Sequence, residues 1–458
     1  MRLSLCLFGL AAVVVASGLA APAGPGWSRF GYDAARSGHG PATAGVTAAN
    51  VGRLVRQQVR LDGTADSSPI AAGGLVVVTT SYGKAIALDP RTGRIRWRFT
   101  PPGYSTWAGT YRITNSSPVS DGRFLWTADP GGRIYKLVLQ TGRQIASGGW
   151  PVAVTRLPER EKLGTALNLD HGHVIVTTGG YIGDAPPYQG HVVVLDAGSG
   201  RILGVFNALC SEQADLQRPA VCPQSGAAIW ARSGAVVDPV TGNLLVATGD
   251  GKWNGERYWG DSVLMLSPDA TRLLQAWTPK DFAALDSGDV DLGSTAPAIL
   301  PGRLALQSGK DGLMRLLDLR KLNGRGGAGP VTGGEVQTLS TPGGGGLFSA
   351  PAVFGRLVFV AQDGATAGYR LVGRRLRKVW SNGTSGTSPV VAGGLLYVYD
   401  PEGGLNVYVP SSGRRVASLP AGPGHWSSPI VADGRVILPE GDANDHATTG
   451  VLNIYRLR

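Results

Sequence analysis

The chain has 458 residues and contains 69 glycines and 30 prolines, so more than one residue in five favours a turn over a helix. Glycine and proline are the two poorest helix formers, and this density excludes a helical bundle or a coiled coil. Disorder is excluded as well, because hydrophobic residues make up 43% of the chain and charged residues only 16%. The composition therefore predicts a large, turn-rich, all-β protein.

The net charge of +11 arises from 43 Lys and Arg against 32 Asp and Glu. These basic residues are spread along the chain, often singly in turns such as Arg91 and Arg94, and they form no stripe with interleaved aromatics. A nucleic-acid binder usually concentrates its positive charge on one surface. We therefore expect no nucleic-acid partner.

A secretory signal peptide is predicted over residues 1–23. Arg2 supplies a positive charge, residues 7–15 form an apolar run, and small residues over 16–23 offer cleavage sites. Cys6 precedes the apolar run, where a lipoprotein acceptor cysteine would not lie. No other apolar run is long enough to span a membrane. We expect an exported protein, periplasmic or extracellular, with no stable membrane anchor after signal cleavage.

Two cysteines follow the predicted signal peptide, Cys210 and Cys222. An even pair in an oxidising compartment indicates a disulfide. Closing a loop of this size stabilises the folded state by about 3 kcal/mol in the chain-entropy model. We predict that the two cysteines are bonded, with two buried thiols as the alternative.

One sequence pattern recurs along the chain: a Ser/Thr-Pro start, a Gly turn, an apolar strand, a second Gly turn and a strand that ends in Leu-Asp. Clear copies start at Ser67, Ser116, Ser294, Ser349, Thr387 and Ser427, and two weaker copies start at Ala166 and Gly234. In the first copy, residues 74–80, 85–89 and 94–98 have the length and composition of strands. Eight copies of four short antiparallel strands predict an eight-bladed β-propeller.

The propeller is expected to be one unit, since each blade buries its faces against its neighbours. A spare strand over residues 53–59 precedes the first copy, and residues 451–455 end the chain without an outer partner. We therefore predict that the N-terminal strand closes the ring. The predicted organisation is a signal peptide over 1–23, a lead-in over 24–52 and a propeller over 53–458.

The first repeat, Ala-Leu-Asp-Pro-Arg-Thr-Gly-Arg-Ile-Arg-Trp at residues 87–97, resembles the repeat of the pyrroloquinoline quinone (PQQ) propeller superfamily. That superfamily contains quinoprotein alcohol dehydrogenases and non-catalytic propellers. Residues 27–33 and 50–54 resemble its N-terminal lead-in. The resemblance covers the chain after the signal peptide and implies the fold. It does not decide activity, because the residues of the repeat pack the blades and do not carry the chemistry.

Residues 230–254 resemble the dehydrogenase segment that carries an aromatic cofactor floor and a calcium ligand. The resemblance implies that Trp230 lies under the quinone and that Asp250 binds Ca²⁺, which prefers oxygen ligands. Asp291, within Asp-Val-Asp-Leu-Gly-Ser, best matches the family's catalytic aspartate, which takes the alcohol proton while hydride passes to the quinone. Lys310 resembles the basic residue that contacts the quinone oxygens.

The chain also departs from the dehydrogenase pattern. The family's adjacent cysteine pair is absent where the chain reads Ala-Asp-Pro-Gly over 128–131, and its glutamate calcium ligand is replaced near Gly180. No C-x-x-C-H motif is present, so we expect no covalently bound haem c. Each candidate also has a structural alternative: a hairpin tip for Asp250 and Lys310, a strand-start cap for Asp291 and core packing for Trp230.

Two hypotheses remain. The first is a quinoprotein-type dehydrogenase that oxidises alcohols or sugars with PQQ and Ca²⁺ in the central channel. The second is a non-catalytic propeller that acts as a scaffold for a protein or ligand in the cell envelope. The partner is accordingly a small-molecule substrate or an envelope protein. The first hypothesis requires the four candidate side chains to converge on one axial cavity.

Overall fold

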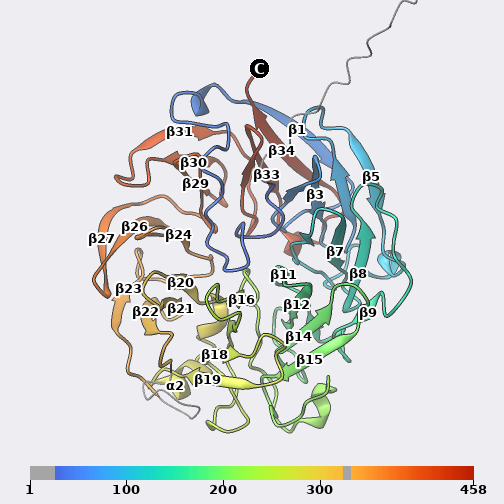
Figure 1. Cartoon of the computed structure of the whole chain (residues 1–458), viewed down its shortest axis with the longest axis vertical. Helices are drawn as coiled ribbons and strands as arrows, with labels where there is room; N and C mark the ends of the chain where they lie inside the picture. Colours follow the sequence, from blue (N-terminus) through green and yellow to red (C-terminus); the bar gives the residue numbers. More distant parts are fainter. Residues whose placement is uncertain (1–25, 323–331) are drawn as a thin grey trace, which may run out of the picture.

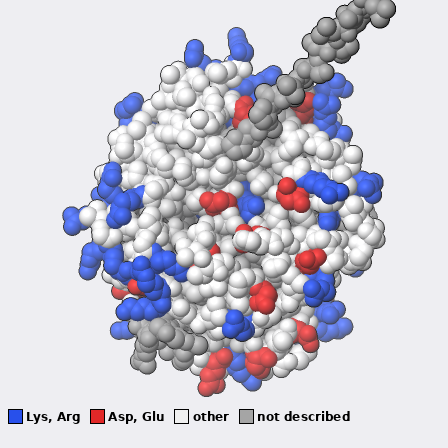
Figure 2. Space-filling model, viewed as in Figure 1, with Lys and Arg blue, Asp and Glu red and all other residues white. Residues whose placement is uncertain are grey.

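Eight four-stranded antiparallel sheets form a closed ring in the computed structural model, which describes residues 26–322 and 332–458 (Figure 1). The predicted eight-bladed propeller is therefore confirmed. The predicted signal peptide lies outside the described residues. On the face that Figure 2 shows, lysines and arginines lie mostly around the edge. Among the described residues, none of the helices has the length and apolar character needed to cross a membrane.

Each blade follows one repeat copy. The strands of the first four blades are β2 (Ile70–Ala72), β3 (Leu75–Thr79), β4 (Ala85–Leu88), β5 (Ile95–Phe99); β6 (Val119–Ser120), β7 (Phe124–Ala128), β8 (Arg133–Val138), β9 (Val152–Ala153); β11 (Asn168–Asp170), β12 (His173–Thr177), β14 (His191–Asp196), β15 (Ile202–Asn207); β16 (Val236–Val237), β17 (Leu244–Ala247), β18 (Val263–Leu266), β19 (Leu273–Trp277). A separate two-stranded pair joins β10 (Glu161–Lys162) to β13 (Gly179–Gly180).

The strands of the last four blades are β20 (Ala298–Leu300), β21 (Leu304–Ser308), β22 (Leu313–Asp318), β23 (Gln337–Ser340); β24 (Ala352–Phe354), β25 (Leu357–Gln362), β26 (Ala365–Val372), β27 (Arg375–Asn382); β28 (Val390–Ala392), β29 (Leu395–Tyr399), β30 (Leu405–Tyr408), β31 (Arg415–Leu419); β32 (Ile430–Ala432), β33 (Arg435–Glu440), β34 (Gly450–Arg456) and β1 (Val55–Leu61). Two short helices, α1 (Tyr104–Trp107) and α2 (Phe282–Ser287), lie in loops.

The recurring serines explain why the repeat keeps its start. The first serine ties the start to the second strand of its own blade, as Ser67 Oγ does by donating to the Thr79 carbonyl at 2.8 Å. The second serine joins neighbouring blades: Ser117 Oγ accepts from the Ser68 amide, and Ser68 Oγ accepts from the Ser428 amide, each at 2.9 Å. These bonds satisfy buried backbone groups at the blade interfaces.

The ring closes between its two ends. β1 pairs antiparallel with β34, from Val55 opposite Arg456 to Leu61 opposite Gly450, and completes the last sheet as its outer strand. The predicted closure by the N-terminal strand is confirmed. This pairing leaves no open blade, which removes an exposed sheet edge.

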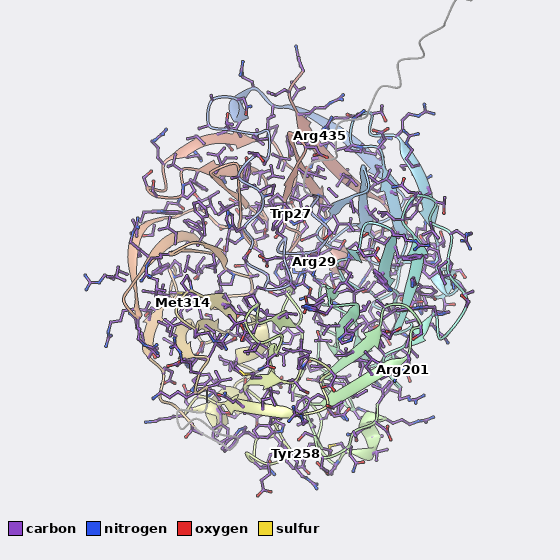
Figure 3. The ribbon with its side chains drawn as sticks, viewed as in Figure 1. Trp27, Arg29, Arg201, Tyr258, Met314 and Arg435 are labelled. Atoms are coloured by element: carbon purple, nitrogen blue, oxygen red, sulfur yellow. A yellow bond between two sulfur atoms is a disulfide. The ribbon has the colours of Figure 1, made fainter. Side chains whose placement is uncertain are left out.

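The lead-in over residues 26–50 crosses the centre of the ring, where Trp27 and Arg29 are labelled (Figure 3). Its carbonyls accept hydrogen bonds from the inner strands of six blades, through Ala71, Ser120, Val237, Val353, Val391 and Gly434. The buried Arg36 reaches a seventh blade by donating to the carbonyls of Ala166 and Leu167 at 3.2 and 2.9 Å. One end of the channel is thus closed by the chain itself.

The predicted disulfide is confirmed, since Cys210 and Cys222 are bonded to each other. Both cysteines are buried, and they form a small apolar cluster with residues such as Leu209, Ala227 and Tyr258. The cluster lies mostly in the long connection between β15 and β16, and Tyr258 joins it from the connection between β17 and β18. The connection between β15 and β16 leads directly to Trp230 at the channel.

Candidate functional site

A cavity of about 360 Å³ is lined by segments that precede the inner strands of the blades and by loops between other strands. Its lining includes Asn115, Lys162, Tyr181, Asp184, Trp230, Arg232, Asp250, Asp289, Asp291, Lys310, His425 and Trp426. The structure therefore brings together all four side chains that the sequence singled out for the channel. Their chemical roles stay predictions.

Two neighbouring blades supply these four residues. Trp230 precedes β16 and Asp250 follows β17, both in the fourth blade. Asp291 lies between α2 and β20, and Lys310 lies in the turn between β21 and β22, both in the fifth blade. The turns between strands point functional groups toward the axis, while the strands carry the packing.

The acidic side of the cavity is a hydrogen-bonded cluster. Asp291 Oδ1 accepts from the Asp250 amide at 2.7 Å, and Asp291 Oδ2 lies 2.5 Å from Lys310 Nζ. Lys310 Nζ also lies 2.7 Å from Asp289 Oδ1. Oxygens of Asp250, Asp289 and Asp291 all lie within 4.8 Å of one another. Gly249 permits this approach, since a Cβ there would lie 2.1 Å from Asp291 Oδ1.

The cluster holds more carboxylates than its single ammonium neutralises. Burial, followed by the charge of Asp291, raises the pKa of Asp250 to about 8. Burial also raises the pKa of Asp261 to about 8, with further contributions from Asp291 and Asp250. Although burial opposes it, hydrogen bonds to Asp289 and Asp291 raise the pKa of Lys310 above its ordinary value. Carboxylates that resist ionisation in this way favour an added cation.

Three aromatic rings form a platform beside this cluster. The ring centroids of Trp230, Phe348 and Trp426 are 5.9 to 6.1 Å apart in every pair, so the rings do not form a single column. Lys310 Nζ lies 5.7 Å from the centroid of the Trp230 ring, and the Arg232 guanidinium lies 5.6 Å from that of Trp426. An apolar surface flanked by two cations suits a flat, conjugated, anionic ligand.

A second buried carboxylate, Asp66, contacts several residues that line the cavity. It accepts hydrogen bonds from Asn115 Nδ2 at 2.6 Å, His425 Nδ1 at 2.8 Å and the Trp426 amide at 3.0 Å. Arg232 pairs with it at 3.6 Å. Although burial opposes it, Arg232 and His425 hold the pKa of Asp66 below its usual range. Burial lowers the pKa of the nearby Lys162 to about 8.

Four residues at the channel were not predicted from the sequence, although they share a signal: Asp66, Asn115, Phe348 and Trp426. Each directly precedes a Ser-containing start of a repeat, in the first, second, sixth and eighth blades. All four lie at the channel, as lining residues or as direct partners of lining residues. The position before each start is thus an axial position of the ring.

Comparisons with known proteins agree with the propeller fold. A PQQ_2 family model, described as outer membrane protein assembly factor BamB, matches residues 44–153. Quinohemoprotein alcohol dehydrogenase ADH IIB of Pseudomonas putida is 27% identical over 343 residues, covering 66% of this chain and 47% of the relative. The predicted resemblance to PQQ-repeat propellers is confirmed. The dehydrogenase subunit of the quinone-type alcohol dehydrogenase of Acetobacter aceti is 25% identical over 44% of this chain and 31% of the relative.

Solved structures share the propeller fold of this chain. The quinohemoprotein alcohol dehydrogenase of Comamonas testosteroni matches with a TM-score of 0.72 and 16% identity, covering 94% of this chain and 80% of that one. A europium-containing methanol dehydrogenase matches with a TM-score of 0.71 and 15% identity, over 94% and 98%. BamB from Moraxella catarrhalis matches with a TM-score of 0.54 and 13% identity, over 88% and 98%. This propeller spans about half the length of the first curated relative.

The departures from the dehydrogenase pattern have visible consequences in the structure. In the stretch that replaces the cysteine pair, Asp129 is buried and accepts a hydrogen bond from the Tyr135 hydroxyl at 2.7 Å. The segment around Gly180, where a glutamate ligand was expected, lines the cavity without a glutamate, and Asp184 is its acidic residue. Burial raises the pKa of Asp184. The loop therefore brings a fourth carboxyl group to the cavity.

Proposed function

We propose that this PQQ-repeat propeller is a quinoprotein-type dehydrogenase, which oxidises alcohols or sugars with PQQ and a metal ion in the axial cavity. The observation that carries the proposal is the convergence of Asp250, Asp291 and Lys310 beside Trp230. The named relatives include alcohol dehydrogenases, which supports the same reaction class. We further propose that the protein is exported and carries no covalent haem c.

The residues present fit a flat quinone and a metal ion. The platform of Trp230, Phe348 and Trp426 offers aromatic surface for stacking, and Lys310 and Arg232 offer positive charge beside it. Three carboxylate oxygens within 4.8 Å of one another match the spacing of ligands around an ion that binds oxygen at about 2.3–2.6 Å. Ca²⁺ is the proposed metal, and a trivalent lanthanide is the alternative that the excess of carboxylates supports.

When bound, the quinone accepts hydride and the metal polarises it for that step. The residues of the chain then have separate tasks. Trp230 positions the flat ligand, Asp250 binds the metal, and Lys310 donates hydrogen bonds to anionic oxygens. Asp291, which the resemblance implies as the proton acceptor, also keeps Lys310 in place through their ion pair.

Titration of the purified protein with PQQ, in Ca²⁺ or in a lanthanide salt, tests the proposal by calorimetry. We expect binding at micromolar concentration, followed by dye reduction with members of a panel of alcohols and sugars. Asp291→Asn is expected to lose most turnover, either as the proton acceptor or as the partner of Lys310. Absence of PQQ binding with both metals would exclude the dehydrogenase.

A matched control is available within the repeat. Asp400 follows β29 as Asp250 follows β17, but it does not line the cavity. Asp400→Asn should leave metal and PQQ binding unchanged, whereas Asp250→Asn should weaken metal binding at least tenfold. Equal effects of the two substitutions would mean that Asp250 acts through folding only.

The match of residues 44–153 to the BamB family model supports a second candidate, a non-catalytic scaffold for an envelope protein or ligand. A scaffold has no need of a carboxylate cluster beside an aromatic platform, so we rank it second. Two results together would favour the scaffold. The parent protein would not bind PQQ, and the Asp250→Asn and Lys310→Met variants would assemble normally with an envelope partner.

A further inference from the structure

Asp66 is built to hold one imidazole in a fixed orientation. Its side chain has 0% exposure. Its two oxygens accept hydrogen bonds from His425 Nδ1, Asn115 Nδ2 and the Trp426 amide, and Arg232 is the counter-ion. A buried carboxylate is tolerated when its charge is paired and its oxygens are hydrogen-bonded. Two of these contacts, those to His425 and to the Trp426 amide, fix the first and eighth blades relative to each other at the channel.

His425 is held on a second side by stacking. Its ring centroid lies 4.2 Å from that of Trp426, with an interplanar angle of 16°. Because Nδ1 faces carboxylates, at 2.8 Å from Asp66 and 3.3 Å from Asp442, we assign its proton to Nδ1. The remaining nitrogen, Nε2, then carries a lone pair. Within residues 26–322 and 332–458 no group hydrogen-bonds to Nε2, and the side chain lines the cavity.

Asp291 is more heavily committed than His425. One of its oxygens accepts from the Asp250 amide at 2.7 Å, and the other lies 2.5 Å from Lys310 Nζ. Both oxygens of Asp291 therefore already have partners within the protein. The cavity thus contains two candidate proton acceptors, and the imidazole nitrogen is the uncommitted one.

We propose that His425, positioned by Asp66, is a catalytic base of the cavity and takes the hydroxyl proton of the substrate. The substrate O–H bond breaks and its proton moves to Nε2, while the hydride on the adjacent carbon moves to the quinone and a carbonyl product forms. Asp66 stabilises the resulting imidazolium. This departs from the role that the family resemblance implies for Asp291, and it rests on the proposed dehydrogenase function.

Four charged groups surround His425 from other segments. Asp66 and Asp442 lie 2.8 and 3.3 Å from its Nδ1, Arg232 pairs with Asp66 at 3.6 Å, and Lys162 lines the same cavity. The chain also offers a matched control, because His171 Nδ1 lies 2.7 Å from Asp170 Oδ2 in an exposed pair outside the cavity. That pair has the same chemistry without the burial or the aromatic platform.

The test compares His425→Gln, Asp66→Asn and His171→Gln, with His425→Asn in reserve if the glutamine variant does not fold. The measurements are PQQ affinity by calorimetry and the pH profile of kcat/KM for dye reduction. We expect His425→Gln to bind PQQ within about threefold of the parent, to lose about 10²-fold or more in kcat/KM and to lose the acidic limb of the profile.

Asp66→Asn should shift that limb and lower kcat with little change in KM, as expected for a positioning residue, and His171→Gln should match the parent. If a folded His425→Gln keeps the parent's kcat/KM and its acidic limb, while Asp291→Asn loses both, the proton acceptor is Asp291 and this inference is wrong. If the parent protein neither binds PQQ nor reduces dye with any hydroxyl substrate, the dehydrogenase proposal fails and this inference fails with it.

Discussion

Lys310 Nζ lies 2.5 Å from Asp291 Oδ2, so the ammonium that is proposed to contact the quinone is already paired with an acid of the proposed metal cluster. The same ammonium contacts Asp289 Oδ1 at 2.7 Å. Lys310 therefore occupies the place of a cation among these carboxylates. A metal ion that binds the cluster has to compete with it.

Removing that ammonium should strengthen metal binding and weaken quinone binding. We expect Lys310→Met to bind Ca²⁺ or Eu³⁺ about tenfold more tightly, which corresponds to about 1.4 kcal/mol, and PQQ about tenfold more weakly. Calorimetry and europium luminescence measure the two effects. Lys84 is the matched control, because it lies at the equivalent turn of the first blade and pairs with Asp62 outside the cavity. A parallel loss of both affinities in Lys310→Met would show disruption of the cluster instead.

The metal-free protein should become less stable as the pH rises. Burial raises the pKa of Asp250 and of Asp261 to about 8, above the values that the unfolded chain would have. Between about pH 4 and 8 the folded state therefore holds protons that the unfolded state has released, and the free energy of unfolding falls as these protons leave.

We expect this free energy to drop by about 2 kcal/mol between pH 5 and pH 8, after allowance for the partial exposure of Asp250. Denaturant titrations at several pH values measure it. Asp261→Asn should remove part of the slope, since Asp261 Oδ2 is buried and no described residue hydrogen-bonds to it. Saturating metal should reverse the trend, because the ionised carboxylates bind the ion. A rise in stability with pH in the metal-free protein would contradict the assignment.

Asp66→Asn tests how far the network around Asp66 supports the ring. Arg232 has 4% side-chain exposure and would lose its buried counter-ion, so we expect a loss of about 3–5 kcal/mol in the free energy of unfolding. Asp62→Asn is the control, because Asp62 pairs with Lys84 and Arg98 at 43% exposure and should cost less than about 1 kcal/mol. Similar small losses in both variants would mean that water or a rearranged side chain compensates for Asp66.

The blades could be predicted from the sequence because each copy repeats the same hydrogen-bonding and turn residues. The serine starts, the Gly turns and the apolar runs all act within one blade or between adjacent blades, so a linear pattern records them. Trp230, Asp250, Asp291 and Lys310 came from a family resemblance over two adjacent blades. Their convergence follows from the ring, which places corresponding turns around one axis.

The second half of the cavity could not be found in this way. Asp66 and His425 are separated by 359 residues and meet only because the eighth blade lies beside the first. Phe348 and Trp426 come from other blades and pack on Trp230 across the channel. Each of these four residues, considered alone, is consistent with an ordinary turn. Only the closed ring shows which of these turns face one another.

The disulfide between Cys210 and Cys222 supports the acidic cluster through the backbone. Gly226 follows the disulfide loop and forms a bridge with Gly251, and the Ala227 amide donates to the Asp250 carbonyl. Ala227 and both cysteines belong to the same buried cluster. Removal of the covalent link should therefore affect Asp250 as well as global stability.

We expect the double variant Cys210→Ala/Cys222→Ala to lose about 3 kcal/mol in the free energy of unfolding. The two cysteines are 12 residues apart in the sequence, and without the bond the loop between them no longer restricts the unfolded chain. Metal affinity should fall severalfold at a temperature where the variant is fully folded, because Asp250 loses part of its backbone support. Denaturation of the parent protein with and without a reductant gives the same comparison without substitution. An unchanged metal affinity beside the expected loss of stability would show that the bridge at Gly226 and Gly251 positions Asp250 without help from the disulfide.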